Sequence, residues 1–132
     1  MSKMLKLQFP ARVYASGLSA TSAMANWINT GEHIILSDDG YGERNDSFEL
    51  LMVWFESPSN PLLKVVDIRL VVQIVKEYDP NILVVVDNTF MSPFFQKPLL
   101  LGADAVLHSI TKYINGHSDV VMGVLLQISK SG

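Results

Sequence analysis

The feature that most constrains the fold is an unbroken apolar run near the middle of the chain. Residues 81–87 consist of Ile, Leu and Val between Asn81 and Asp87. A strand that is apolar at every position is typical of a parallel sheet with helices on both faces, because neither face of such a strand meets water. Residues 50–56 show a similar pattern and end in a carboxylate, Glu56. We therefore predict an α/β fold with a mainly parallel sheet.

Shorter segments supply the remaining predicted elements. Apolar runs at residues 33–36, 105–107 and 120–128 are further candidate strands. A helix is predicted after the potential N-cap Asp67, and Asp79-Pro80 ends it. Its apolar residues share one face at helical spacing, and they are Ile68, Val71, Val72, Val75 and Tyr78.

A second helix, rich in small residues, is predicted over residues 16–29. The pair Ser16-Gly17 begins it, and Thr30-Gly31 stops it, because glycine accommodates the backbone turn that ends a helix.

Composition narrows the class of protein. The chain has 132 residues, of which 48% are hydrophobic and 17% charged, so it is long enough and apolar enough for one domain with a core. The net charge is -3 without a basic block, which argues against a nucleic-acid surface. There is no cysteine, and no apolar run reaches the roughly 18 residues of a membrane span. We expect a cytoplasmic domain that binds neither nucleic acid nor membrane.

Several familiar sites are excluded by the absence of their motifs. His33, His108 and His117 do not have the spacing of zinc ligands. Dinucleotide, P-loop and nucleophile-elbow motifs are also absent.

Polar residues follow the C-terminal ends of four predicted strands. In open α/β sheets ligands bind at that edge, so the pattern predicts a small-molecule site. The residues are Asp38, Asp39 and Tyr41 after the first strand, Glu56 and Asn60 after the second, Asp87 and Asn88 after the third, and Ser109, Thr111 and Lys112 after the fourth.

Lys112 and Asp87 are the two candidates for chemistry. Lys112 lies between hydroxyl residues after a strand, and a desolvated lysine can lose its proton and act as a nucleophile. The alternative is a solvated surface lysine. A carboxylate at Asp87 is costly unless donors or a cation, such as a charged ring nitrogen, face it. The alternative is that Asp87 caps the turn into Asn88 and Thr89.

The start of the first helix is a candidate phosphate site. Backbone N–H groups at Gly17 and Leu18, beside the hydroxyl of Ser16, are free to bind an anion, and Ser109 and Thr111 can add donors. Ordinary helix capping explains the same residues.

Two further residues can bind a flat heterocycle. Tyr41 can stack on the ring, and Asn60 can donate to a ring oxygen. The alternatives are a surface tyrosine and a turn residue before proline.

Taken in order, these segments resemble the transsulfuration, or Cys/Met metabolism, family of pyridoxal 5'-phosphate (PLP) enzymes. The resemblance runs from about Tyr14 to Gly123 and is closest to the cystathionine γ-lyases. The most specific segment is residues 109–123, SITKYINGHSDVVMG. The other similar segments are residues 84–90, VVVDNTF, followed by Pro93; residues 54–61, WFESPSNP; and residues 15–20, ASGLSA.

The resemblance implies a role for each candidate. Lys112 would bind PLP covalently and then move protons on the substrate, and Asp87 would face the pyridine nitrogen. Tyr41 would stack on the ring, and Asn60 would approach its phenolic oxygen. The phosphate would be bound by the remaining candidates, which are Ser16, Gly17, Leu18, Ser109 and Thr111.

A cystathionine γ-lyase-like activity is implied as well. The reaction would be a PLP-dependent cleavage of a carbon–sulfur bond, with cystathionine converted to cysteine, 2-oxobutanoate and ammonia. Cystathionine or cysteine would be the substrate, and the subunits would form homo-oligomers, as dimers of dimers. The alternative is a catalytically inactive remnant that binds PLP or joins oligomers.

The resemblance also predicts that residues 1–132 form one partial PLP-binding domain of the aminotransferase-like type, fold type I. The family's N-terminal arm and C-terminal substrate domain would be absent. Only residues 42–49 stand in place of a family helix and strand, too few for a parallel crossover of about a dozen residues. We expect one deleted βα unit, a gap or re-pairing in the sheet, and an edge prone to aggregation.

Overall fold

The computed structural model describes residues 10–36 and 49–128. Within them the helices are α1 (Gly17–Ala25), α2 (Ile68–Tyr78), α3 (Ser92–Phe95) and the 3-10 helix η1 (Pro98–Leu101). The strands are β1 (Ala11–Tyr14), β2 (Glu32–Leu36), β3 (Glu49–Glu56), β4 (Leu83–Asp87), β5 (Ala105–Ser109) and β6 (Gly123–Gln127).

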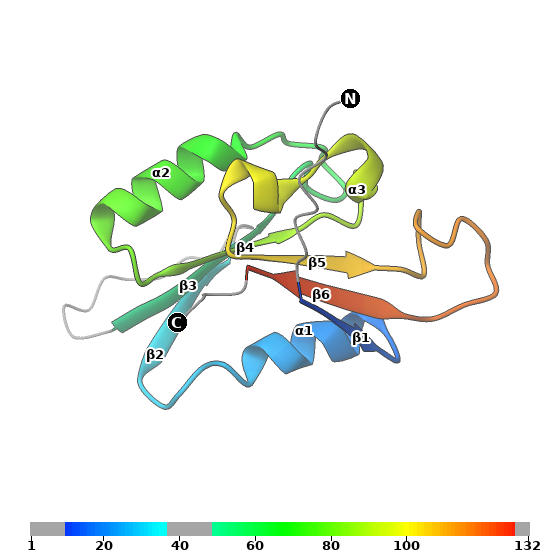
Figure 1. Ribbon diagram of the computed structural model, residues 1–132, viewed down its shortest axis with the longest axis horizontal. Helices are drawn as coiled ribbons and strands as arrows, with labels where there is room; N and C mark the ends of the chain where they lie inside the picture. The colour runs from blue at the N-terminus through cyan, green and yellow to red at the C-terminus, as the bar shows by residue number, and fades with distance from the viewer. Residues whose placement is uncertain (1–9, 37–48, 129–132) are drawn as a thin grey trace, which may run out of the picture.

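The described strands form one mixed sheet in the order β1-β6-β5-β4-β3-β2. Strands β2 to β5 pair in parallel, whereas β6 is antiparallel to both of its neighbours, β5 and β1. Helix α1 covers one face of the sheet, and α2, α3 and η1 lie on the other (Figure 1). The predicted α/β class with a mainly parallel sheet is confirmed.

Strand β4 is buried on both faces, as its composition predicted. Val84, Val85 and Val86 are completely inaccessible, and they alternate between the two cores. Val85 packs with Met24 of α1 and Leu107 of β5, whereas Val84 and Val86 pack with Ile68 at the start of α2. Two apolar layers therefore fix β4 at the centre of the fold.

Asp67 caps α2 as predicted. Its Oδ1 accepts hydrogen bonds from the backbone N–H groups of Arg69 (2.9 Å) and Leu70 (3.2 Å), which have no partner within the helix. Both predicted helices are therefore present, each with a side-chain cap at its start.

The predicted end of the first helix at Asn29 was wrong, since α1 ends at Ala25. The Trp27 N–H bonds to the carbonyl of Met24 and that of Ile28 to Ala25, which are tighter turns than an α-helix has. The chain tightens there because it must reverse towards β2, which begins at Glu32. Apolar Trp27 and Ile28 suggested a longer helix than this reversal allows.

Strand β1 was not predicted, and β6 begins at Gly123 rather than at Val120. The four residues of β1 are mostly exposed at the sheet edge, so they show no apolar run. The antiparallel direction of β6 follows from its pairing with β5, in which Ser109 lies opposite Gly123. Such pairing is a tertiary property that a local pattern does not carry.

The sheet has no gap where a family βα unit was expected to be missing. Strand β2 pairs directly with β3, from Glu32 opposite Glu49 to Leu36 opposite Trp54. The connection is residues 37–48, which reaches the length of about a dozen residues that a parallel crossover needs. We expected a gap or a re-pairing of the neighbouring strands, and the described sheet has the pairing of β2 with β3 and no gap. Strand β2 is an edge of the described sheet, and Ile35 and Leu36 are exposed on it.

Candidate functional site

The start of α1 lies against the end of β5. Ser16 is the N-cap of α1, and its Oγ accepts a hydrogen bond from the N–H of Ser19 (2.9 Å). The N–H groups of Gly17 and Leu18 have no partner among the described residues. A Cβ on Gly17 would lie 3.1 Å from both Cβ and Oγ of Ser109. The start of α1, with two free donors, therefore lies beside the hydroxyl of Ser109, which suits an anion.

Gly123 makes this close approach possible from the neighbouring strand. A Cβ there would overlap the carbonyl oxygen of Ser16 and lie 2.9 Å from the Cα of Gly17. Since both contacts are with backbone, the absence of a side chain at Gly123 lets the start of α1 settle onto the sheet.

The turn after β4 joins Asp87 to Ser109. Oδ1 of Asp87 accepts a hydrogen bond from the Thr89 N–H (2.9 Å), and Oγ1 of Thr89 accepts one from the Ser109 N–H (2.8 Å). The turn-capping interpretation of Asp87 is therefore correct for Oδ1. Oδ2 accepts no hydrogen bond from a described residue, so it is available to a ligand.

Thr89 is a residue that the sequence interpretation missed. Its hydroxyl joins the aspartate segment to the lysine segment, through Ser109. The signal was present, because Thr89 lies within the family-like stretch VVVDNTF and follows the strand end that carries Asp87.

Asn60 lies in the loop after β3, next to the aspartate strand. Glu56 at the end of β3 is opposite Asp87 in the β3–β4 register, and it accepts a hydrogen bond from the Asn60 N–H (3.2 Å). Asn60 is exposed, and its side-chain amide bonds to no described residue. The ring-oxygen role of Asn60 stays a prediction.

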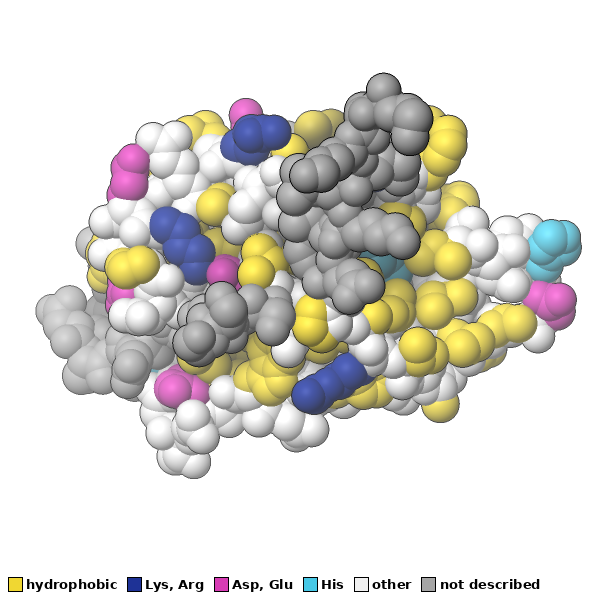
Figure 2. All heavy atoms as spheres, in the orientation of Figure 1, with side chains coloured by type: hydrophobic (Ala, Val, Ile, Leu, Met, Phe, Trp, Pro, Cys, Tyr) yellow, Lys and Arg dark blue, Asp and Glu magenta, His cyan; other side chains and the backbone are white. Residues whose placement is uncertain are grey.

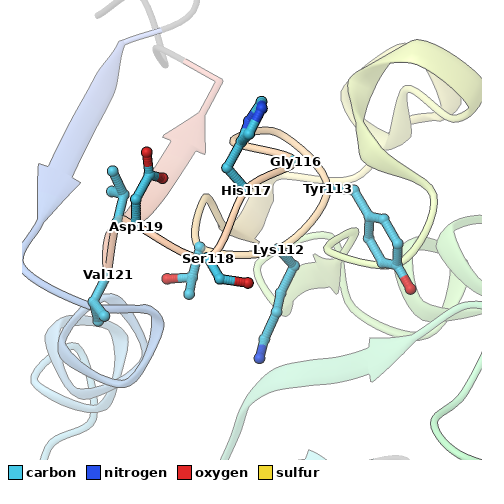
Figure 3. A pocket seen from close by; sticks show the side chains of 9 residues that line it. Lys112, Tyr113, Gly116, His117, Ser118, Asp119 and Val121 are labelled. Atoms are coloured by element: carbon cyan, nitrogen blue, oxygen red, sulfur yellow. The ribbon is translucent and has the colours of Figure 1, made fainter.

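Lys112 is exposed in the loop between β5 and β6. Its backbone N–H bonds to the carbonyl of Ser109 (3.2 Å), which ties the start of the loop to the strand end. In Figure 3 the Lys112 side chain extends to the opposite side of the loop from His117. The described residues therefore do not desolvate Lys112, which agrees with the alternative of a solvated lysine.

This loop, residues 110–122, encloses a wide recess. The recess has a volume of about 690 Å³, and its lining includes Thr111, Lys112, Tyr113, His117 and Asp119. Figure 3 shows the side chains of Lys112, His117 and Asp119 around the loop, with the Tyr113 ring set to one side. The recess can admit a small molecule, and Lys112 is the cation on its wall.

Thr111 is already occupied within the same loop. Its Oγ1 accepts a hydrogen bond from the Met122 N–H (2.9 Å) and donates to the Met122 carbonyl (3.2 Å). A phosphate role for its hydroxyl would require the proton that it already donates to the Met122 carbonyl, so Ser109 is the better placed donor.

His108 is the buried titratable group beside the site. It is 3% exposed, and its Nδ1 has no partner among the described residues. Burial lowers the pKa of His108 below its ordinary value of 6.5, while the charge of Asp87 and a hydrogen bond with the backbone of Asn88 act in the opposite direction. The imidazole is therefore neutral near pH 7.

Three further observations concern Tyr41, metal ions and membrane-spanning helices. Tyr41 lies outside the described residues, so its stacking role stays a prediction. Among the described residues, no group of three or more His, Cys, Asp or Glu side chains is arranged to hold a metal ion. No helix within residues 10–36 and 49–128 is long and apolar enough to cross a membrane.

The surface around the site is apolar rather than basic. On the face shown in Figure 2, hydrophobic side chains gather over β6 and the segment leading into it, whereas Lys and Arg side chains are scattered. The exposed apolar residues near this region include Val13 and Val121.

The residues present fit a ligand that combines a phosphate with a charged ring nitrogen. The start of α1 and Ser109 suit the phosphate, the open carboxylate oxygen of Asp87 suits the ring nitrogen, and Lys112 supplies an amine. An α/β protein that binds PLP would need these features.

Comparison with known proteins identifies the family. A profile described as Cys/Met metabolism PLP-dependent enzyme matches residues 49–131, and this chain belongs to that family. It is 54% identical over 144 positions to putative cystathionine gamma-lyase 2 of Caenorhabditis elegans. The human cystathionine gamma-lyase is 42% identical over 140 positions.

Both relatives are longer than this chain. The first alignment covers 87% of this chain and 37% of the nematode protein, and the second covers 85% and 34%. Since the aligned 144 positions exceed 132 residues, the nematode protein has positions inside the aligned region that this chain lacks. The expected internal deletion is thereby supported.

A solved structure agrees with these relatives. The structure of metB from Corynebacterium glutamicum is 35% identical with a TM-score of 0.80, and it matches over 91% of this chain and 38% of the other. The fold is therefore that of part of a fold type I PLP enzyme.

Proposed function

We propose that this chain forms the PLP-binding part of a carbon–sulfur lyase of the cystathionine γ-lyase type. The observation that carries the proposal is the meeting of three segments at one end of the sheet. Gly17 at the start of α1 lies so close to Ser109 that a Cβ on it would be 3.1 Å away, and Thr89 joins Ser109 to Asp87. Lys112 follows Ser109 by a single turn.

In this proposal the helix start and Ser109 hold the phosphate. The N–H groups of Gly17 and Leu18 would donate to it at the positive end of the helix dipole, and only the backbone of Leu18 would take part because its side chain has no hydrogen-bonding group. Ser16 keeps the helix start in place as its cap, and Thr111 closes the lysine loop.

Asp87 would keep the ring nitrogen of the cofactor protonated. Its Oδ1 is oriented by the Thr89 N–H, which leaves Oδ2 to face the ring. Asn60 would donate to the phenolic oxygen, and Tyr41 would stack on the ring. PLP bound in this way supplies an electron sink for the substrate carbons.

Lys112 would hold the cofactor and then carry protons. The Lys112 amine would be the group that moves protons at the substrate carbons. The net reaction takes cystathionine and water to cysteine, 2-oxobutanoate and ammonia. The amine must be neutral for this, and we propose that a neighbouring subunit in a homo-oligomer covers the exposed Lys112 and removes water from it.

A second candidate is PLP binding without turnover. The exposure of Lys112 favours it, because none of the described residues keeps water away from the amine. The chain would then bind PLP or associate with subunits of a longer relative without catalysing the reaction.

Trapping of bound PLP tests both candidates. The purified chain is incubated with PLP, its visible absorption is recorded, and borohydride reduction followed by peptide mapping locates the labelled lysine. We expect a visible band and label concentrated at Lys112. Lys112→Ala should lose both, whereas Lys97→Ala, which removes another exposed lysine, should keep both. A labelling pattern spread evenly over all lysines would overturn the proposal.

Turnover separates the two candidates. Cystathionine is added to the PLP-loaded chain, and 2-oxobutanoate and ammonia are measured. Equal release of the two products supports the lyase, and label at Lys112 without release supports the second candidate.

A further inference from the structure

A hydrogen-bond network centred on Gln96 lies next to the proposed cofactor site. Gln96 directly follows α3, and its Nε2 donates to the carbonyl of Ser57 (2.8 Å) and to Oδ1 of Asn88 (2.8 Å). Ser57 follows the end of β3, and Asn88 follows the end of β4. One side-chain amide therefore connects the loops after two neighbouring strands.

Asn88 extends this connection to a third strand. Its Nδ2 donates to the carbonyls of Ser92 (3.1 Å) and Gln96 (2.9 Å), and its backbone N–H donates to Leu107 of β5 (2.9 Å). Asn88 is 1% exposed, so no bulk water competes for these bonds. Every polar group of its side chain is paired, which makes the arrangement specific as well as stable.

Ser57 fixes the base of the loop that carries Asn60. Its Oγ donates to the Val66 carbonyl and accepts from the Val66 N–H, both at 3.0 Å, and the residue is 1% exposed. The loop is thus closed on itself at Ser57. The bond from Gln96 to the Ser57 carbonyl then sets where the closed loop stands relative to β4.

We infer that Gln96 is a positioning residue for the proposed cofactor site. It holds the loop of Asn60 at a fixed place relative to the turn of Asp87, and Asn88 ties that turn to β5, which ends at Ser109. Gln96 itself is neither a predicted ligand nor next to one in sequence. Groups that bind one small ligand must be held within about 0.5 Å of their working positions. The hydrogen bonds from Gln96 to Ser57 and Asn88 restrict the two loops in this way.

The effect on PLP binding rests on the proposed function, whereas the link between the loops does not. Two measurements therefore address the inference separately. The first is amide hydrogen exchange of the chain without PLP, followed by mass spectrometry of peptides. The second is the affinity for PLP, from titration of the visible band.

The variant Gln96→Met keeps the length of the side chain and removes both donors. The Ser57 carbonyl and Oδ1 of Asn88 then lose a partner in a part-buried place. We expect exchange in residues 57–66 and 88–96 to become about tenfold faster, with α1 unchanged. The affinity for PLP should fall about tenfold, while label remains at Lys112.

Gln73→Met is the matched control, because it makes the same change on the surface of α2. Gln73 Nε2 donates to Oε1 of Glu77 at the same distance of 2.8 Å, but both residues are exposed. Exchange in residues 57–66 and 88–96 and the affinity for PLP should both stay as in the wild type. If the methionine variant unfolds, Gln96→Glu replaces it, because it keeps the side-chain shape and removes only the donor. The same changes in hydrogen exchange and in the affinity for PLP are expected.

Each other result overturns part or all of the inference. Unchanged exchange in both loops overturns the link, and acceleration that includes α1 shows overall destabilisation instead of positioning. Local acceleration with unchanged PLP affinity overturns the positioning role. A wild-type chain that takes up no PLP defeats the proposed function and the cofactor half of the inference, and the exchange result still decides the link.

Discussion

Asp87, at the end of β4, and Lys112, in the loop after β5, are the two most important candidates, and the loops beside them are held in different ways. The loop after β4, residues 88–91, begins at Asn88, whose hydrogen bonds reach α3, Gln96 and β5. Through Gln96 it also reaches the loop after β3. The residue after Asp87 is therefore hydrogen-bonded to several elements, which hold Asp87 in place.

The loop after β5 is bonded mainly to itself. Asn115 Nδ2 donates to the His117 carbonyl (2.8 Å) and to Oδ1 of Asp119 (2.7 Å), and Thr111 bonds to Met122. In Figure 1 this loop extends away from the sheet beyond the ends of β5 and β6. Lys112 thus has a defined local shape but little contact with the rest of the described chain.

The difference shows what each part of the site requires. The carboxylate of Asp87 is oriented by residues of this chain alone, whereas the amine of Lys112 remains in water. A site assembled from both needs a further surface on the lysine side. That is why the proposal places a neighbouring subunit there.

The largest expected loss of stability comes from a substitution at the base of the lysine loop, compared with the same substitution at its tip. Gly123→Ala should destabilise the fold by on the order of 3–4 kcal/mol, because its Cβ would overlap the Ser16 carbonyl oxygen, which is backbone and cannot rotate away. Gly116→Ala, at the tip, should cost about 1 kcal/mol, since its Cβ meets only Tyr113 O at 3.9 Å and the cost comes from a φ of +70°. Urea unfolding measures both.

Equal losses in the two glycine variants would contradict this account. Gly123 would then not be the point at which α1 and the sheet approach each other most closely.

A smaller loss of stability is expected when an asparagine is replaced by alanine in each of the two loops. Asn88→Ala should lower the free energy of unfolding by about 2–3 kcal/mol, because it leaves buried carbonyls and Gln96 without partners. Asn115→Ala should cost about 0.5–1 kcal/mol, since its partners His117 and Asp119 are exposed to water. Urea unfolding of the two variants side by side provides the measurement, and a larger loss for Asn115→Ala would refute the contrast.

The smallest effect concerns pH and the buried end of β5. Because burial lowers the pKa of His108, the unfolded chain binds a proton near pH 6.5 that the folded chain does not. His108 therefore does not change the free energy of unfolding above pH 6.5. It lowers this free energy as the pH falls from 6.5 towards the pKa of His108 in the folded chain. One group contributes at most about 1.4 kcal/mol per pH unit.

Two histidine variants isolate that contribution. His108→Leu should flatten the loss of unfolding free energy between about pH 6.5 and pH 5, where an ordinary histidine takes up its proton, and His117→Leu in the exposed loop should leave it in place. A slope that survives in His108→Leu would show that another group is responsible.

Much of the fold was predictable because its strongest signals are local. The apolar run around Val85 predicts a strand buried on both faces, and the spacing after Asp67 predicts α2 with its cap. Strand β1 was missed because a short exposed edge strand has no such pattern. The antiparallel direction of β6 depends on its partner, so no local pattern could indicate it.

The candidate site was predictable to the extent that residues follow strand ends. Asp87 and Ser109 lie where the strand order brings them together, and the sequence named both. It did not indicate Gln96, since a single glutamine after a short helix looks like a surface residue until its two acceptors are known. The exposure of Lys112 depends on whether other parts of the molecule cover the loop. The hydroxyl residues next to it in the sequence do not indicate this.

The antiparallel pairing of β5 with β6 has a consequence for how the lysine segment can change over time. Ser109 and Gly123 are register partners, so the segment leaves and re-enters the sheet at a single point. Insertions, deletions or a backbone cut between them leave both strands hydrogen-bonded to each other. The sheet can therefore tolerate large changes in residues 110–122. Such changes can accumulate in evolution without moving Asp87, which lies on β4, two strands away from β6.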